Sequence, residues 1–343
     1  MINEFIELSK FAGMREDLVQ AGGGNSSVKI SDTEMIIKAS GYQLADVSDS
    51  KGYSIVNYQM IQEYLKQLTD GSCNISEKEI LEKVLVKGER PSIETFLHAI
   101  TDRVTLHVHA VAVNILASRK EGILVLEELF PDALIVDYKT PGLKLALEYY
   151  RVNRQNSSIV ILKNHGLIVS GKSFEEVIRV IDSVCMKIEQ KLGIDYSAYR
   201  ASYKIYKMLQ NAGINSPGVV VKVENHVIMD LFKKNGQRLW KYQICPDCLV
   251  YCGIKELIIA DKTTSDDIRS FIKSYGIPAI IQYGEGLYIH SESIHKVREI
   301  ESVLAYSAHV SGNWADFEIT ILPEDEQRFL ISWDAEKYRK TIK

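Results

Sequence analysis

Apolar runs with strand character alternate with amphipathic helical segments along this chain, and this alternation constrains its fold more than any other feature. The clearest strand runs are VTLHVHA at 104–110 and SIVILKNHGLIVSG at 158–171. Apolar residues at helical spacing predict helices at 57–68, 76–87 and about 174–192. Strands that lie between helices throughout a chain indicate the α/β class.

A cluster of Gly, Asn, Ser and Pro at 211–219 interrupts the pattern, which then restarts with further strands and helices. The chain has 343 residues, and about 100–200 residues per domain is usual. We therefore predict two domains, the first at 1–212 and a second, smaller α/β domain at 220–343.

Charge and hydropathy exclude several classes of partner. The 41 Lys and Arg residues nearly balance the 45 Asp and Glu residues, and no long basic run offers a surface for nucleic acid or an anionic membrane. No stretch approaches the ~20 apolar residues of a membrane span, and the N-terminus lacks the pattern of a signal peptide. We expect a cytoplasmic protein with a small-molecule partner, and its five cysteines to be reduced thiols.

Two histidines in the expected strand at 104–110 are the first candidates for chemistry. His107 and His109 are two residues apart, so both side chains leave the same face of a strand and can bind one cation. The alternative is chance placement of both rings on a half-buried strand, because so short a motif also occurs without a metal.

Two further residues favour a metal site. His165 lies in a Lys-Asn-His-Gly turn between two apolar runs and would complete a set of three imidazoles, which suits a cation such as zinc and leaves room for substrate. Glu94 follows Pro91 at the start of an expected helix. Its carboxylate can bind the metal or, when displaced, act as a base.

Five motifs in order give the chain a resemblance to a known family. They are GGGNSS at 22–27, KASG at 38–41, PSIE at 91–94, HVH at 107–109 and NHG at 164–166. Over about residues 1–210 the chain resembles the class II aldolase and adducin family, near the rhamnulose-1-phosphate and fuculose-1-phosphate aldolases. The resemblance implies a three-layer αβα fold for this part of the chain.

The resemblance also implies roles for individual residues. His107, His109 and His165 would hold the metal, and Glu94 would be both ligand and general acid/base. Gly24 and Asn25 would lie beside the substrate, with Asn25 hydrogen-bonded to the enediolate oxygen. The residues that would cradle a substrate phosphate are Ser26, Ser27, Ser40, Gly41 and Ser92. Each of these serines could equally satisfy its own turn.

A second acid for the aldehyde oxygen is harder to assign. Members of the family take a tyrosine or glutamate from beyond the HVH strand, often from a neighbouring subunit. Here Glu127 and Glu128 precede Tyr138 in that interval, and we select Glu128. The alternative for either glutamate is a solvated position on a helix surface.

The implied activity is that of a metal-dependent aldolase, a lyase that cleaves or forms a carbon–carbon bond in a sugar or ketose phosphate through a metal-stabilised enediolate. One divalent metal per subunit is expected, zinc before manganese, iron, cobalt or nickel, in a homo-oligomer that is most often a tetramer. The same scaffold serves pentulose-phosphate 4-epimerases, decarboxylases and dehydratases. From another class, an adducin-like interaction protein would need no metal.

A separate cysteine motif lies in the second predicted domain. Cys245, Cys248 and Cys252 form CxxCxxxC, a spacing that occurs in zinc and redox sites. A structural zinc needs a fourth ligand, and no nearby Cys or His supplies one. We interpret these cysteines as small buried apolar residues.

Overall fold

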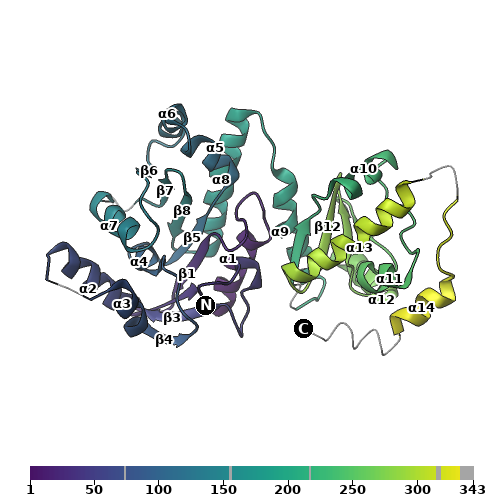
Figure 1. The fold of residues 1–343 in the computed structure, drawn as a ribbon, viewed down its shortest axis with the longest axis horizontal. Coiled ribbons are helices and arrows are strands. Elements are labelled where there is room, and N and C mark those ends of the chain that lie inside the picture. The colour runs from purple at the N-terminus through teal and green to yellow at the C-terminus, as the bar shows by residue number, and fades with distance from the viewer. Residues whose placement is uncertain (73–74, 154–156, 216–217, 314–317, 333–343) are drawn as a thin grey trace. The chain divides into compact units, whose positions relative to one another are not determined.

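The computed structural model describes residues 1–72, 75–153, 157–215, 218–313 and 318–332 (Figure 1). Its internal contacts divide the chain into unit 1, Met1–Tyr196, and unit 2, Ser197–Lys343. The division falls before the predicted boundary at 212–220, because helix α9 (Ser197–Asn211) packs on strand β9 (Val219–Lys222) and so belongs to unit 2.

Unit 1 is built on one large sheet. The strands described in it are β1 (Asn25–Lys29), β2 (Glu34–Lys38), β3 (Tyr53–Asn57), β4 (Leu85–Gly88), β5 (Val104–Val108), β6 (Leu134–Val136), β7 (Ile159–Leu162) and β8 (Gly166–Gly171). Their order in the sheet is β4-β3-β2-β1-β5-β8-β7-β6, and neighbours are antiparallel except β6 and β7. The central position of β5 puts the HVH segment in the middle of the sheet.

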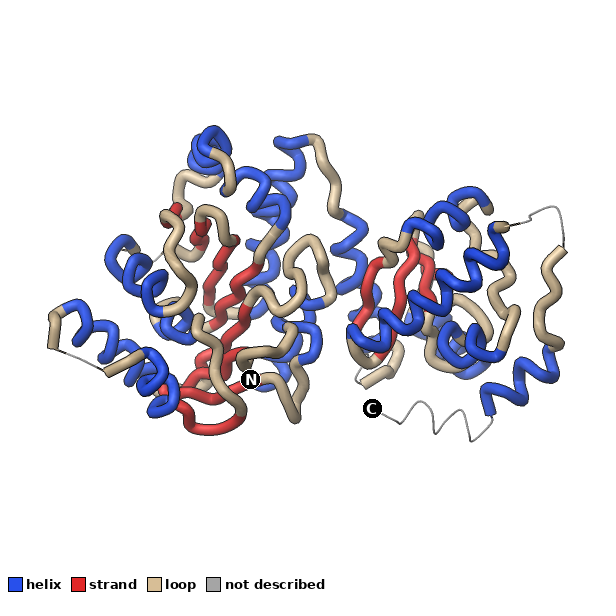
Figure 2. The backbone as a smooth tube through the Cα atoms, viewed as in Figure 1, coloured by secondary structure: helices blue, strands red, loops and turns tan. Residues whose placement is uncertain are grey.

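Helices cover both faces of this sheet, as the blue and red segments of unit 1 in Figure 2 show. The described helices of unit 1 are α1 (Ile2–Gly13), the 3₁₀ turn η1 (Leu44–Asp46), α2 (Tyr58–Thr69), α3 (Glu77–Val84), α4 (Thr95–Ala99), α5 (Val111–Ala117), α6 (Lys120–Leu129), α7 (Leu143–Val152) and α8 (Phe174–Leu192). One apolar core joins α2, α3, α4 and α7 to the sheet, and α1, α5 and α8 pack on its other face. The predicted α/β class and three-layer arrangement are confirmed.

Local sequence explains several of these boundaries. β1 and β2 form an antiparallel hairpin around the turn at Ser31. Helix α8 starts where the Ser173 side chain accepts a hydrogen bond from Glu176 N and ends at Gly193, whose φ of +66° favours glycine. The helix predicted at 76–87 instead ends at Val84, because Leu85–Gly88 pairs with β3 at the sheet edge.

Unit 2 has a four-stranded sheet in the order β10-β11-β12-β9. Its further described elements are α10 (His226–Lys234), α11 (Pro246–Cys252), β10 (Leu257–Ile259), α12 (Ser265–Tyr275), β11 (Ile280–Tyr283), β12 (Gly286–Ser291), α13 (Ile294–Gly312) and α14 (Glu324–Ser332). α13 packs on β12 and β9 and is contacted by α10 and α11, while α9 packs on β9. Among the described helices of both units, none has the length and apolar composition needed to span a bilayer.

Candidate metal centre

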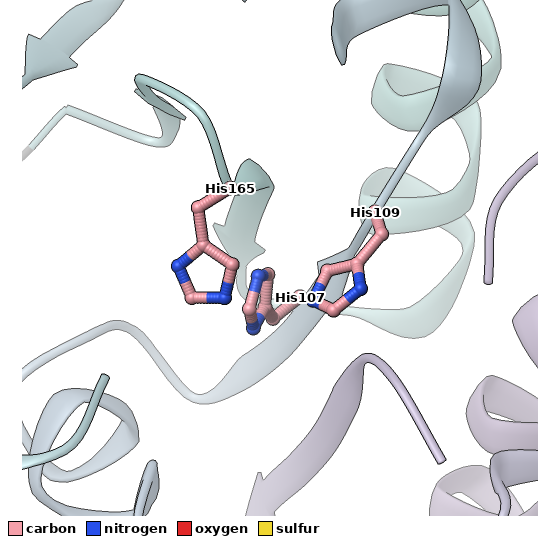
Figure 3. Close-up of side chains that lie close together, drawn as sticks. All are labelled: His107, His109 and His165. Carbon is pink, nitrogen blue, oxygen red and sulfur yellow. The ribbon is translucent and has the colours of Figure 1, made fainter. Parts of the chain in front are cut away.

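Three imidazole rings meet where β5 ends beside the turn that joins β7 to β8 (Figure 3). His107 lies within β5 and His109 directly after it, and His165 lies in the turn. The ring centroids of His107 and His165 are 4.7 Å apart, and that of His109 lies 5.1 and 5.2 Å from these two. One ring nitrogen of each histidine lies within 4.8 Å of the others. The three residues that the sequence pattern grouped are therefore also brought together by the fold.

The turn that presents His165 is held by backbone geometry and by a neighbouring helix. Asn164 adopts a φ of +57°, a left-handed conformation that asparagine tolerates, and His165 N donates to Leu162 O at 3.1 Å. The side-chain amide of Asn114 on α5 donates to His165 O, also at 3.1 Å. Sequence reasoning missed Asn114, although a lone amide in the apolar run VAVNILA is a signal of a buried hydrogen bond.

Gly166 allows this turn to approach β5 closely. A Cβ atom on Gly166 would lie 2.2 Å from the carbonyl oxygen of Val108, so a side chain there must push β8 away from β5. We expect Gly166→Ala to lower the free energy of unfolding by about 1–3 kcal/mol, as overpacking does, and to weaken metal binding by displacing His165. Denaturant unfolding and metal titration measure the two effects.

The matched control for Gly166→Ala is Gly22→Ala. Gly22 is exposed, and a Cβ atom on it would meet nothing within 4 Å. This variant should stay within about 0.5 kcal/mol of the parent protein. Equal stability and equal metal affinity of the two variants would contradict the role assigned to Gly166.

Glu94 places a buried carboxylate against the histidines. Its Oε2 lies 2.8 Å from His107 Nδ1, and its Oε1 lies 3.8 Å from His165 Nε2. Burial favours the neutral acid, but His107, with His98 and His165 nearby, lowers the pKa of Glu94 to about 2. Glu94 is therefore ionised near neutral pH. It lies just before α4 instead of in the first turn of the predicted helix.

The protonation state of the rings suits a cation. Burial and the neighbouring His107 lower the pKa of both His109 and His165 to about 4, although Glu94 opposes the shift. Both rings are therefore neutral near pH 7, the form that can donate a lone pair to a metal.

Unpartnered polar atoms at the site test whether a metal fits. His107 Nε2, His165 Nδ1 and Asn25 Oδ1 are buried and have no hydrogen-bond partner among the described residues. Buried polar atoms normally have partners, and the free Nε2 of His107, whose other ring nitrogen contacts Glu94, is the kind of atom that a missing ligand would leave unpaired. Neutral imidazoles beside a carboxylate are a donor set that suits zinc or a similar divalent ion. The residues present fit such a metal.

The glycine-rich loop lies against the histidines. Asn25 is paired with His107 across the β1–β5 ladder and is 1% exposed. Gly24 has a φ of +74°, and a Cβ atom on it would lie 2.9 Å from His107 O. A Cβ atom on Gly23 would lie 2.6 Å from His109 Nδ1. This close approach is available only to glycine.

Part of the expected phosphate cradle lies beside Glu94. Ser40 N donates to Arg90 O at 2.9 Å, and an isolated bridge joins Ala39 to Pro91, so the KASG and PSIE segments are neighbours. Ser92 Oγ accepts from Glu94 N at 3.3 Å. Ser40 and Gly41 are exposed, which leaves them available to a ligand.

The prediction of phosphate contacts for Ser26 and Ser27 does not agree with their positions. Ser26 Oγ lies 2.7 Å from Ser9 Oγ of α1, on the opposite face of the sheet from Asn25. Ser27 Oγ lies 2.7 Å from His98 Nδ1, and both serines are at most 1% exposed. Side chains alternate along a strand, so adjacent serines in β1 cannot both face one ligand. Both hydroxyl groups make hydrogen bonds in the interior of unit 1.

Two further polar residues surround Glu94. His98 is fully buried, and burial lowers its pKa to about 3, so its ring is neutral. Lys38 is 3% exposed and donates to Tyr42 O at 2.7 Å. Burial lowers the pKa of Lys38, and the nearby carboxylate of Glu94 opposes this shift. Sequence reasoning gave Lys38 no role, although a lysine at the end of an apolar strand inside a recognised motif is a signal of function.

Glu128 lies apart from the histidine cluster in the contacts of the described residues. Its side chain is 72% exposed on α6, and its carboxylate lies 4.0 Å from Lys191 Nζ. A second copy of the chain could reach it there, so its role as the second acid stays a prediction.

Comparison with known proteins agrees with this architecture. The model of the Class II Aldolase and Adducin N-terminal domain matches residues 3–187, more than half of the chain. The N-terminal class II aldolase domain of a conserved protein from Thermoplasma acidophilum is 24% identical in sequence to this chain. The match covers 56% of this chain and 93% of that domain's chain. Its TM-score of 0.50 shows a shared fold.

Two other solved structures are less similar. The L-fuculose-1-phosphate aldolase of Thermus thermophilus is 17% identical, with 55% of this chain and 92% of its own covered and a TM-score of 0.38. YgbL from Klebsiella pneumoniae, provisionally assigned as an aldolase, epimerase or decarboxylase, is 16% identical, with 55% and 86% covered and a TM-score of 0.41. No curated protein matches the chain.

Proposed function

This chain belongs to the class II aldolase and adducin family, and from that premise we propose that it is a metal-dependent aldolase. Its substrate class would be a sugar or ketose phosphate, in which it cleaves or forms a carbon–carbon bond. The observation that supports this most is the meeting of His107, His109 and His165 with a carboxylate, Glu94, 2.8 Å from one of the rings.

The three histidines would hold one divalent cation, zinc before manganese, iron, cobalt or nickel. A cation there supplies positive charge that polarises a substrate carbonyl and stabilises an enediolate. Glu94 is ionised and buried beside this position, so it can take a proton from the reacting carbon or return one. Asn25, in the neighbouring strand, can donate an amide hydrogen bond to the enediolate oxygen.

A phosphate on the substrate would be bound by Ser40, Gly41 and Ser92, with the ammonium of Lys38 nearby. The support for this set is that the KASG and PSIE segments are joined by the bridge between Ala39 and Pro91. Hydroxyls and backbone amides on such turns can bind an anion. Lys38 adds positive charge on the same side as Glu94, whose carboxylate interacts with it.

Metal content tests the proposal first. Purified protein should carry close to one divalent metal per chain, and the double variant with His107→Ala and His109→Ala should lose it, because a single imidazole, His165, cannot hold the ion. Mass spectrometry of the metal measures both. The matched control is His295→Ala, which removes an imidazole whose side chain is 81% exposed and should leave the metal in place. No metal in the parent protein, with no uptake on adding one, would favour the adducin-like interaction protein.

Product analysis then separates the activities of the family. An aldolase releases two carbonyl fragments from a ketose phosphate, an epimerase gives a single isomer, and a decarboxylase releases carbon dioxide. If the metal-loaded protein gives only an isomer or carbon dioxide, the aldolase proposal is wrong, but the proposed metal site is not contradicted.

A further inference from the structure

Two thiols of unit 2 lie in contact, far in sequence from the histidine cluster. Cys245 immediately precedes α11, which starts at Pro246, and Cys248 lies in the first turn of that helix. Their sulfur atoms are 3.4 Å apart, and both are free thiols. The sequence suggested that these cysteines are buried apolar residues, but two of their sulfur atoms are in direct contact.

The third cysteine of the motif does not join this pair. Cys252 lies at the far end of α11, and its thiol is directed to Ile300 O at 4.0 Å. Among the described residues, the histidine cluster is the group of three or more possible metal ligands that lie close together, and it includes no cysteine. A two-thiol reaction therefore suits this motif better than a metal.

The two thiols differ in their access to a reagent. Cys245 is half-buried, whereas Cys248 has no exposed surface. Burial, with the adjacent Cys245, raises the pKa of Cys248 to about 12 and keeps this thiol protonated near neutral pH. A reagent in solution can therefore reach Cys245, whereas Cys248 is shielded from solvent.

We propose that Cys245 and Cys248 form a reversible disulfide, with a peroxide as the oxidant. A sulfur–sulfur bond of ~2.05 Å needs only a short approach from the observed contact. The Cys245 sulfur attacks one oxygen of hydrogen peroxide, the O–O bond breaks, and the displaced oxygen takes up the thiol proton and leaves as water, so the product on Cys245 is a sulfenic acid. Cys248 sulfur then attacks Cys245 sulfur, the S–O bond breaks, and the second water leaves with the thiol proton. Two thiols are oxidised and one peroxide is reduced to two waters.

The test uses the full chain with Cys73→Ser throughout, because Cys73 lies outside the described residues. The protein is treated with hydrogen peroxide, the remaining thiols are alkylated, and the sites are mapped by mass spectrometry. We expect loss of both alkylation sites, Cys245 and Cys248, with the loss of two hydrogen atoms in mass, and full recovery after reduction by dithiothreitol. Continued alkylation of both thiols at the rate of the untreated protein would overturn the proposal.

Single substitutions distinguish the two roles. Cys248→Ser should leave a sulfenic acid at Cys245 that a dimedone probe traps, whereas Cys245→Ser should leave Cys248 unreactive. The matched control is Cys252→Ser, which removes a buried thiol of the same helix and should form the disulfide as before. A disulfide that joins Cys252 to either partner, or dimedone labelling at Cys248 in place of Cys245, would contradict the assignment.

Discussion

Replacing Glu94 by Gln is expected to lower kcat by about 10²- to 10⁴-fold, the usual range for loss of a general acid or base. In the parent protein the carboxylate of Glu94 lies 2.8 Å from His107 Nδ1. The amide of glutamine has the same size and keeps an oxygen that can accept this hydrogen bond. It cannot take up a proton from the substrate at neutral pH. The loss should therefore fall on turnover, while the three histidines remain to hold the metal.

Steady-state kinetics and metal analysis of the same preparation measure this result. Glu127→Gln is the matched control, because Glu127 is an exposed glutamate on α6 and should retain the parent rate. Unchanged turnover of Glu94→Gln with metal bound would show that another group moves the proton. Loss of the metal together with activity would instead identify Glu94 chiefly as a ligand.

Arg15→Ala should give the largest loss of stability in unit 1. Arg15 is 1% exposed, and its guanidinium contacts Asp17 at 2.7 Å and Asp182 of α8 at 2.5 Å. Removing the arginine leaves the carboxylate of Asp17 buried without its counter-ion, and breaking a buried pair in this way costs about 3–5 kcal/mol. At about 2–4 °C per kcal/mol, the melting temperature of this unit should fall by roughly 10 °C.

Calorimetry resolves this effect, and a surface arginine provides its control. Arg151 contacts Glu148 at the same distance, 2.5 Å, but 71% of its side chain is exposed. Water and salt screen such a pair, so Arg151→Ala should leave the melting temperature nearly unchanged. Equal shifts for the two variants would show that burial does not set the strength of the Arg15 network.

Each part of the histidine cluster has a local signal in the sequence, and the resemblance to the family indicated that the parts lie together. Two histidines separated by one residue share a strand face, and the Asn-His-Gly turn needs a residue such as Asn164, whose φ is +57°. The helix α8 was equally predictable, since Ser173 and Gly193 mark its two ends. For the helix and for each of the two histidine segments, one short stretch carries both the pattern and its physical cause.

Other features depend on contacts that no local pattern contains. Helix α9 is amphipathic, and this pattern does not show which unit it joins. The turn residues at 211–219 suggested a boundary after the helix. Because α9 packs on β9, the contacts of the structure divide the chain at Tyr196, before the helix. Leu85–Gly88 continues the apolar pattern of α3, and only the edge of β3 makes it a strand. Motif matching also treated Ser26 and Ser27 as equivalent, although strand alternation points them to opposite faces.

The antiparallel pairing of β5 with β8 determines when a metal can bind during folding. His165 follows His107 by 58 positions in the chain, and the two rings meet only after this long-range ladder has formed. The unfolded chain offers only the weaker pair from the HVH segment, so an ion held by all three histidines would be a ligand of the native state. Each tenfold rise in free metal above its dissociation constant would then add about 1.4 kcal/mol to the stability of unit 1. The supply of metal would thereby shift the folding equilibrium of this unit.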